Sequence, residues 1–181
     1  MIYQPSDDSY LLQSTLKKFL KDKKKTINIL DMGSGSGIQA ETCQKLKFKN
    51  ILAVDINPLA IKNLIGKKLN AKKSNLFSKI KDHRFDLIIF NAPYLPEDKR
   101  EPEDSRLATT AGKEGYEIIN KFLTQAVTQL KPRASILLLF SSLSKPKVIL
   151  KHAKSLGYNY NLLEKKKIPF EELYVYEFKL N

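Results

Sequence analysis

The stretch "ILDMGSGSG" at residues 29–37 decides the fold, because it joins an apolar strand directly to a glycine-rich turn. Gly33, Gly35 and Gly37 allow the backbone to turn tightly and to approach a ligand, while the following helix points its first N–H groups toward that ligand. A second apolar strand ends in Asp55, at about the spacing from the loop that suits a carboxylate binding a ribose diol. Strand, glycine loop, helix, strand and terminal acid in this order predict a nucleotide-type cofactor site.

Apolar runs alternate with helical patterns through the rest of the chain. The first helix has Ser6 as its cap, with Tyr10, Leu11, Leu16 and Leu20 at helical spacing. The segment "GKKLNAKKSN" (66–75) contains no apolar strand. We predict helices at 6–23, from the glycine loop to about 47, and at 57–68, 115–130 and 145–156, and strands at 26–32, 50–56, 85–90, 135–140, 158–164 and 171–179.

This alternation predicts right-handed crossovers and an α/β fold with a doubly wound, mostly parallel sheet. The last two strands are separated only by "KKKIP", so they must form a C-terminal antiparallel hairpin. A chain of 181 residues is long enough for one domain with a substantial core and too short for two of ordinary size. We therefore expect a single domain over residues 1–181.

Composition limits the setting and the partners. No apolar run is long enough to span a membrane and "MIYQPSDDSY" has no signal-peptide pattern, so we expect a cytoplasmic protein. Cys43 is the only cysteine, which excludes a disulfide framework, and no metal-ligand spacing is present. The net charge is +13, from 32 basic and 19 acidic residues, and the basic residues are 28 Lys and only 4 Arg. A solvated lysine-rich surface is favoured over a nucleic-acid footprint, although nucleic acid stays possible.

The residue before the loop indicates which cofactor binds. Dinucleotide sites usually carry G-x-G-x-x-G, whereas this loop is G-x-G-x-G with Asp31 close before it. A carboxylate there would repel a pyrophosphate but attract the ammonium and sulfonium groups of S-adenosylmethionine. We predict an S-adenosylmethionine site; the alternative is a purely structural tight turn.

The strand at 85–90 ends in "NAPY", residues 91–94. Such a sequence is either a simple turn or a clamp for a planar nitrogen. In a clamp, the Asn91 side-chain oxygen and the Ala92 carbonyl would each accept one hydrogen of the planar nitrogen. Pro93 would fix the backbone, and Tyr94 would provide a flat face for the planar group.

Taken together, the glycine loop, Asp55, "NAPY", "YQPSDDS" (3–9) and "AGKEGYEIINKFL" (111–123) resemble the HemK-type glutamine methyltransferases. The similarity is to the archaeal and eukaryotic branch, which acts on peptide-chain release factors, and it extends over residues 3–178. It implies a Rossmann-like class I methyltransferase fold, S-adenosylmethionine as cofactor and a release-factor glutamine as methyl acceptor.

The resemblance also implies roles for individual residues. Asp8 and Ser9 would approach the amino-acid end of the cofactor, and Asp55 would bind the ribose. Two positions depart from the family, with Ala92 in place of Pro and Asn75 in place of Asp. The implied cofactor-binding residues are Asp8, Ser9, Asp31, Gly33, Gly35, Gly37, Asp55, Ile56, Asn75 and Leu76, and the implied substrate residues are Asn91, Ala92, Pro93 and Tyr94.

Relatives pair with a small zinc-binding activator protein along an edge strand that looks shortened here. Either the strand is vestigial, or the partner docks differently, or there is no partner. Rival functions are methylation of an exocyclic base amine in DNA or RNA, methylation of lysine, and a cofactor-binding scaffold without activity. The isolated His83 and His152 are expected at the surface, and the charged cluster 96–104 is expected to be a solvated loop.

Overall fold

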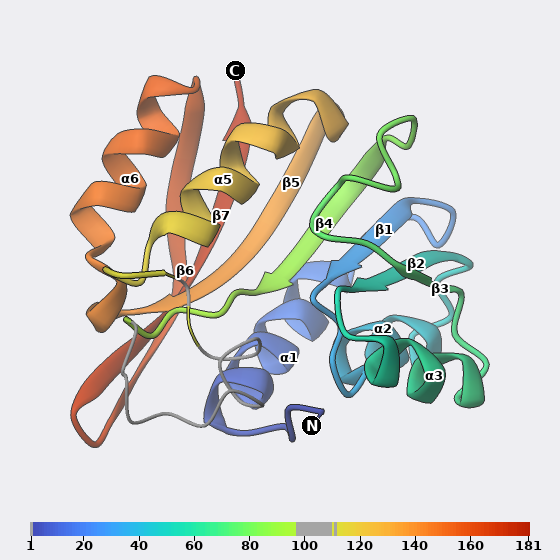
Figure 1. Cartoon of the computed structure of the whole chain (residues 1–181). Helices are drawn as coiled ribbons and strands as arrows, with labels where there is room; N and C mark the ends of the chain where they lie inside the picture. The colour runs from blue at the N-terminus through green and yellow to red at the C-terminus, as the bar shows by residue number, and fades with distance from the viewer. Residues whose placement is uncertain (1, 97–109, 111) are drawn as a thin grey trace.

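A computed structural model describes residues 2–96, 110 and 112–181 (Figure 1). Seven strands form one sheet in the order β3-β2-β1-β4-β5-β7-β6. The pairs among β1 to β5 are parallel, and β6 and β7 form the predicted antiparallel hairpin. Strand β7 is also antiparallel to β5. The strands are β1 Asn28–Met32, β2 Asn50–Asp55, β3 Ala71–Lys73, β4 Phe85–Asn91, β5 Leu130–Ser141, β6 Tyr158–Ile168 and β7 Glu171–Leu180.

Helices cover both faces of this sheet (Figure 1). Alternate residues of the strands point to opposite faces, so that Ile29 packs beneath α1 while Leu30 packs beneath α5. Helices α1, α2 and α3 lie on the first face, and α5 and α6 on the second. Their bounds are α1 Asp7–Leu20, α2 Ile38–Lys45, α3 Pro58–Gly66, α5 Glu117–Ala126 and α6 Pro146–Ser155, with short 3₁₀ helices at Val127–Gln129 and Ser142–Ser144.

The segment 66–75, which contains no apolar strand, holds the three-residue edge strand β3, which pairs in parallel with β2; the edge strand is thus present but short. The Ala53 N–H donates to the Asn70 carbonyl at 2.8 Å, and the Ser74 N–H donates to the Asp55 carbonyl at 2.9 Å. Backbone pairing alone forms this strand, so the apolar side chains that identify an inner strand are not needed. The sheet therefore ends in a short, lysine-bearing edge.

Smaller differences concern the ends of elements. Ser6 makes no side-chain capping bond, and Tyr10 is 55% exposed rather than part of the core. The predicted helix 115–130 gives way to a 3₁₀ turn after Ala126, and β5 begins earlier than predicted, at Leu130. Local sequence patterns predict where a helix or strand lies better than they predict where it ends, because tertiary contacts extend or shorten each element.

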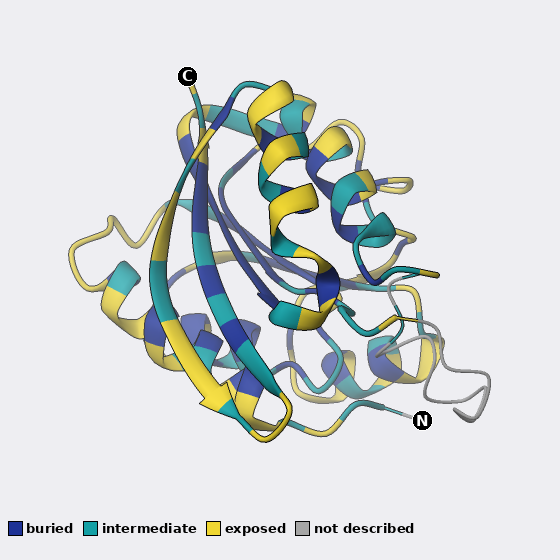
Figure 2. Ribbon diagram, turned by 90° about the vertical axis from the view of Figure 1, so that its left-hand side faces the viewer, coloured by how far each residue is buried: buried dark blue, intermediate teal, exposed yellow. Residues whose placement is uncertain are grey.

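Burial separates the inner strands from the C-terminal edge strand β6 (Figure 2). β5 is buried over most of its length, whereas the edge strand β6 is largely exposed and carries three successive lysines, Lys165 to Lys167. Charged residues on an edge strand oppose pairing with other chains. Cys43 is buried in the core, and no helix in the described parts of the chain is long and apolar enough to cross a membrane.

Candidate active site

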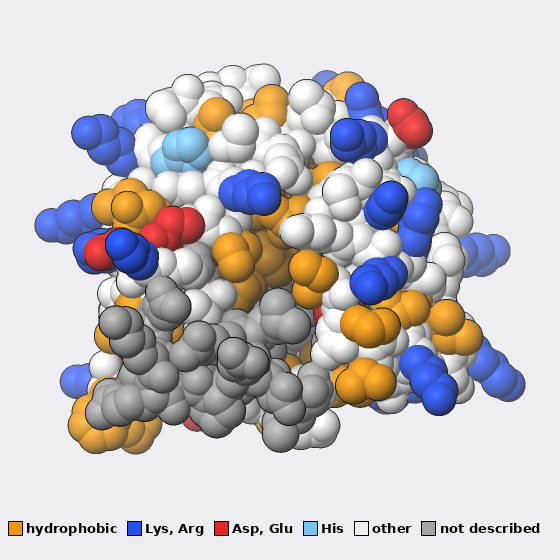
Figure 3. Space-filling view, in the orientation of Figure 1, with side chains coloured by type: hydrophobic (Ala, Val, Ile, Leu, Met, Phe, Trp, Pro, Cys, Tyr) orange, Lys and Arg blue, Asp and Glu red, His pale blue; other side chains and the backbone are white. Residues whose placement is uncertain are grey.

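A cavity of about 490 Å³ opens at the carboxyl ends of the parallel strands (Figure 3). Asp31, Asp55 and Asn91 stand at the ends of β1, β2 and β4, and all three line it. Strand β1 lies between β2 and β4. The chain leaves β1 through α2, which covers one face of the sheet, and leaves β4 toward α5, which covers the other face. Ligands of open α/β sheets bind at such a switch point. The cavity has the size typical of a small-molecule site.

The glycine loop forms one wall of the cavity. Gly33 and Gly35 have φ of 61° and 50°, a left-handed conformation that favours glycine. A Cβ on Gly33 would lie 3.1 Å from the Phe90 ring. The Asp55 carboxylate accepts hydrogen bonds from Gly35 N–H and Asn57 N–H, both at 2.8 Å. Asp55 therefore fixes the loop against the end of β2, and each oxygen keeps a second lone pair for a ligand hydroxyl.

Asp31 lies at the base of this loop and is only 2% exposed. Its Oδ2 atom accepts a hydrogen bond from Ala40 N–H at 3.1 Å, and no salt bridge to Asp31 occurs in the part of the chain that the structure describes. Burial, together with the nearby negative charge of Asp55, raises the pKa of Asp31 to about 7. A buried carboxylate without a cation fits a positively charged ligand group.

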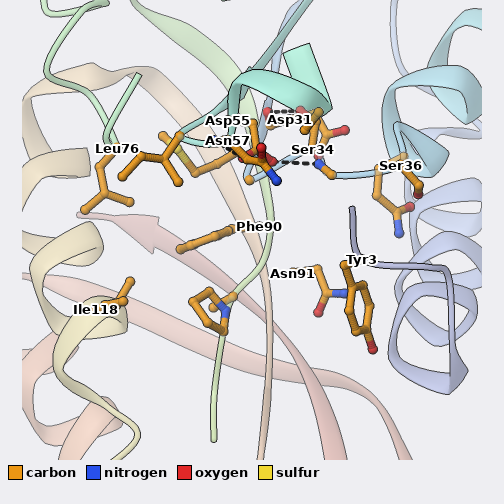
Figure 4. Close-up of a pocket in the computed structure, with 18 of the residues that line it drawn as sticks. Tyr3, Asp31, Ser34, Ser36, Asp55, Asn57, Leu76, Phe90, Asn91 and Ile118 are labelled. Carbon is orange, nitrogen blue, oxygen red and sulfur yellow. Dashed lines mark hydrogen bonds between the residues drawn. The ribbon is translucent and has the colours of Figure 1, made fainter. Parts of the chain in front are cut away.

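Apolar side chains form the opposite side of the cavity. Figure 4 shows Leu76, Phe90 and Ile118 facing the space across from the glycine loop. Leu76 has φ of 47°, and Ser74 holds this turn because its hydroxyl donates to the Leu76 carbonyl at 2.6 Å. These surfaces can cover a flat apolar ring such as adenine, and the exposed Asn75 lies at the rim.

Asn91 faces the same cavity from the end of β4 (Figure 4). Its Nδ2 group donates to Asp8 Oδ2 at 3.0 Å and lies 3.5 Å from Ser9 Oγ. Its Oδ1 atom is buried and has no hydrogen-bond partner among the described residues. A buried acceptor without a donor costs about 1–3 kcal/mol, and such atoms in native proteins often belong to functional sites.

Two tyrosines border Asn91. The Tyr3 hydroxyl donates to Asp8 Oδ2 at 3.0 Å, and Tyr94 packs against the core on both faces of the sheet. Burial, together with the negative charge of Asp8, raises the pKa of both phenols well above the usual value. Neither tyrosine can therefore act as a base near neutral pH.

The structure brings almost all the residues predicted from the sequence into this cavity. Gly37 is the exception, because it is not part of the lining. A Cβ at Gly37 would lie 2.7 Å from Leu64 and 3.3 Å from Leu69, so this glycine permits close packing of α2 against α3. The predicted residues that line the cavity are Asp8, Ser9, Asp31, Gly33, Gly35, Asp55, Ile56, Asn75, Leu76, Asn91, Ala92, Pro93 and Tyr94.

We predict that Gly37→Ala lowers the free energy of unfolding by about 2–4 kcal/mol. Its φ of 89° disfavours any side chain, and the new methyl group would overlap Leu64. Urea denaturation of both proteins without cofactor measures the loss. Gly66→Ala is the matched control, because a Cβ at Gly66 meets nothing within 4 Å. Equal stability of the wild-type protein and Gly37→Ala would contradict the packing role.

The sequence analysis did not assign several residues that line the cavity. Tyr3 lies in the quoted "YQPSDDS" segment, but nothing in its spacing predicts a contact with Asp8. Gln39 is buried, and its Nε2 donates to the Ser9 carbonyl at 2.9 Å, which joins α2 to α1. The charged cluster 96–104 lies outside the described residues except for Pro96. The unassigned lining residues include Tyr3, Ser34, Gln39, Phe90, Ile118 and Lys121.

Comparison with known proteins gives consistent results. The family profile described as methyltransferase small domain matches residues 7–168. A Methanocaldococcus jannaschii protein, named as a candidate protein N5-glutamine methyltransferase, is 36% identical over 96% of this chain and 89% of its own length. The human methyltransferase HEMK2 is 25% identical over 86% of this chain and 79% of its own length.

Among solved structures, the E. cuniculi Mtq2–Trm112 complex, described as responsible for methylating the translation termination factor eRF1, has a similar fold. The TM-score is 0.79, with 24% identity and coverage of 99% of both chains.

The sheet order and the cavity define a class I S-adenosylmethionine-dependent methyltransferase. The chain belongs to the methyltransferase small domain family, in its HemK type. Its methyl donor is S-adenosylmethionine, and the cavity suits this molecule. The buried Asp31 can pair with its positive charge, Asp55 can accept from its hydroxyls, and the apolar wall can cover its adenine.

Proposed function

We propose that the protein methylates the side-chain amide nitrogen of a glutamine in a peptide-chain release factor. The observation that carries this proposal is the buried, unpaired Oδ1 atom of Asn91, an acceptor suited to an amide hydrogen. The relative named as an N5-glutamine methyltransferase and the Mtq2–Trm112 complex, described as methylating eRF1, support the same substrate class. We also propose that the protein acts in the cytoplasm, where release factors work.

The cofactor, when bound, supplies an electrophilic methyl group and leaves as a neutral thioether, so no general acid is required. Asp31 and the loop of Gly33 and Gly35 would hold its methionine part. Asp55 would hold the ribose, and Ile56 with Leu76 would cover the adenine. These assignments remain proposals based on which residues line the cavity and on their chemistry.

The residues 91–94 would act on the acceptor. A carboxamide nitrogen is a weak nucleophile because its lone pair is shared with the carbonyl. Accepting its two hydrogens on Asn91 Oδ1 and the Ala92 carbonyl would fix its orientation and stabilise the positive charge that develops on it. The backbone at Ala92 is fixed from both sides, by Pro93 and by the hydrogen bond from Ala92 N–H to the Leu139 carbonyl at 3.4 Å. Loss of the usual proline at residue 92 should therefore cost little.

Rival acceptors suit this site less well. A lysine must lose its proton before it can react, and Tyr3 and Tyr94 both retain theirs. A base in a duplex must be flipped out, which requires additional contact surface. A scaffold without activity would not require an unpaired acceptor in the cavity.

The test offers purified protein and methyl-labelled S-adenosylmethionine a release factor, duplex DNA and structured RNA side by side. We expect label on a glutamine of the release factor, located by fragmentation mass spectrometry. Label on nucleic acid or lysine would replace the proposal with one of its rivals. Binding of the cofactor without any transfer, with or without an activator protein, would favour the scaffold.

We further propose that a small zinc-binding activator protein docks along the edge strand β3. Ser74 N–H and the Asn70 carbonyl point toward β2, so by alternation the backbone groups of Ala71 and Lys73 point outward. Leu59 and Ile65 on the neighbouring α3 are more than half exposed. An unpaired strand beside exposed apolar side chains is suited to strand addition by a partner. The Mtq2–Trm112 complex supports the proposal as a structural analogue.

We predict that Lys73→Pro weakens binding of such an activator at least tenfold. Proline removes the outward N–H of residue 73 and is tolerated on an edge strand. Lys73→Ala, which keeps the N–H and removes the charge, is the control. Calorimetric titration with the activator measures both variants. Equal binding by the Lys73→Pro variant and the control would exclude docking by strand pairing at β3.

A further inference from the structure

A hydrogen-bond network outside the "NAPY" segment fixes the orientation of Asn91. Asp8, in the first turn of α1, is only 4% exposed, and among the described residues it accepts hydrogen bonds from three neighbours. Its Oδ1 atom accepts from the Ser9 N–H at 2.5 Å and from the Ser9 hydroxyl at 3.1 Å. Its Oδ2 atom accepts from the Tyr3 hydroxyl and from Asn91 Nδ2, both at 3.0 Å.

The chemistry of these groups determines which way the Asn91 amide faces. An ionised carboxylate can only accept hydrogen bonds, so the atom of Asn91 that faces Asp8 must be the NH₂ group. The Asn91 oxygen is then left without a partner among the residues that the structure describes. If the amide rotated by half a turn, its oxygen would face the carboxylate, and its NH₂ group would take the position of the acceptor.

We propose that Asp8 is a positioning residue that holds the Asn91 oxygen in the orientation needed to accept a substrate N–H. This inference rests on the proposed function, since it assigns to Asp8 a role in presenting the acceptor for the glutamine amide. It differs from the expectation that Asp8 contacts the amino-acid end of the cofactor. Asp8 acts through Asn91, and its loss changes the methyl-transfer step rather than cofactor affinity.

The substitution Asp8→Asn tests this role without a change in size. The Ser9 backbone N–H requires an oxygen at the Oδ1 position, so the new NH₂ group must take the position of Oδ2. There it would face the NH₂ group of Asn91, donor against donor, while the Tyr3 hydroxyl can still accept from it. Asn91 is therefore expected to rotate and to present its NH₂ group to the cavity.

The experiment measures kcat at saturating cofactor and the Kd of S-adenosylmethionine for each protein. We expect Asp8→Asn to lower kcat by about 100-fold, the effect of losing one well-placed polar contact in a transition state, with Kd changed less than threefold. In an Asn91→Ala background the same substitution should cause no further loss, because both act through one group. Asp7→Asn is the control, since it removes a charge from the same helical turn, where Asp7 is exposed and pairs with Lys166.

Three results would overturn the inference. The first is a raised Kd of S-adenosylmethionine with a normal kcat in Asp8→Asn, which would assign Asp8 to the cofactor site. The second is an unchanged kcat in Asp8→Asn. The third is a further loss of kcat when Asp8→Asn is added to Asn91→Ala. If the wild-type protein transfers no methyl group to glutamine, the proposed function fails separately. NMR of the wild-type protein then decides the inference. Side-chain amide protons of Asn91 that are protected from exchange and lie close to Ser9 would support it. Amide protons that exchange freely would refute it.

Discussion

Replacing Asn91 with alanine is expected to lower methyl transfer to the release-factor glutamine by about 100- to 1,000-fold. The substitution removes the one side-chain acceptor at the end of β4 whose oxygen is buried and unpaired in the described structure. Loss of one preorganised polar group at a transition state typically has an effect of this size. Single-turnover transfer of labelled methyl, at saturating cofactor, measures the change.

The cofactor should still bind to the Asn91→Ala variant, because its proposed contacts lie on the glycine loop and at Asp55 rather than on β4. Asn161→Ala, at an exposed position on β6, is the matched control and should retain full activity. Undiminished transfer by Asn91→Ala would show that the clamp does not exist. Loss of cofactor binding together with activity would assign Asn91 to the cofactor site instead.

Asp31→Asn has the second large effect, on cofactor affinity. The substitution keeps an oxygen for the Ala40 N–H but removes the negative charge of the buried Asp31 at the base of the loop. A hydrogen bond to a charged group contributes about 1.5–3 kcal/mol, so the Kd of S-adenosylmethionine should rise roughly 10- to 150-fold. Calorimetric titration at pH 7.5 measures it. An unchanged Kd would place the positive charge of the cofactor elsewhere.

The pH dependence of binding follows from the same residue. The pKa of Asp31 is about 7 in the protein without ligand, and a cationic ligand requires the ionised form. The Kd of the wild-type protein should therefore rise as the pH falls through 7, approaching tenfold per pH unit near pH 5.5. Asp31→Asn should lack this dependence between pH 5.5 and 7.5. A wild-type Kd that is constant over that range would contradict the assignment.

The stability of the ligand-free protein should change in the opposite sense. The folded-state pKa of about 7 exceeds the ordinary value of 3.8, so the folded protein binds this proton more tightly than the unfolded chain. The contribution to stability is complete below about pH 3.8 and is lost as the pH rises through 7. Asp31→Asn should thus gain stability relative to the wild-type protein between pH 5 and 7.5, measured by urea denaturation.

The inner sheet could be predicted because its signals are local. Parallel strands that are covered on both faces require continuous apolar runs. Strands β1, β2 and β4 have such runs, and each has a polar residue near its end, Asp31, Asp55 or Asn91. Strand β3 carries only "AKK" and has no such requirement, so nothing in its side chains predicted it. This strand depends on backbone pairing with β2, and no local sequence pattern predicts that pairing.

The candidate site divides in the same way. Asp31, Asp55 and Asn91 could be predicted because each belongs to a local signal, namely the glycine loop, the acid that ends the next strand and the "NAPY" segment. Gly37 belongs to the same glycine motif as Gly33 and Gly35. It must lack a side chain, however, because Leu64 of α3 packs closely against it. A glycine required for packing and one required for ligand approach are identical in sequence, and only the surrounding atoms separate them.

By itself the sequence determined the fold class and the cofactor, and it predicted the segment that we propose holds the acceptor, because these depend on short-range order along the chain. Only the tertiary structure decided that Asp8, which precedes Asn91 by 83 positions, accepts a hydrogen bond from its amide. It also decided that Asp31 is buried with no cation beside it among the described residues and that β3 completes the edge. Burial and long-range hydrogen bonds arise when distant segments pack together, so no local pattern contains them.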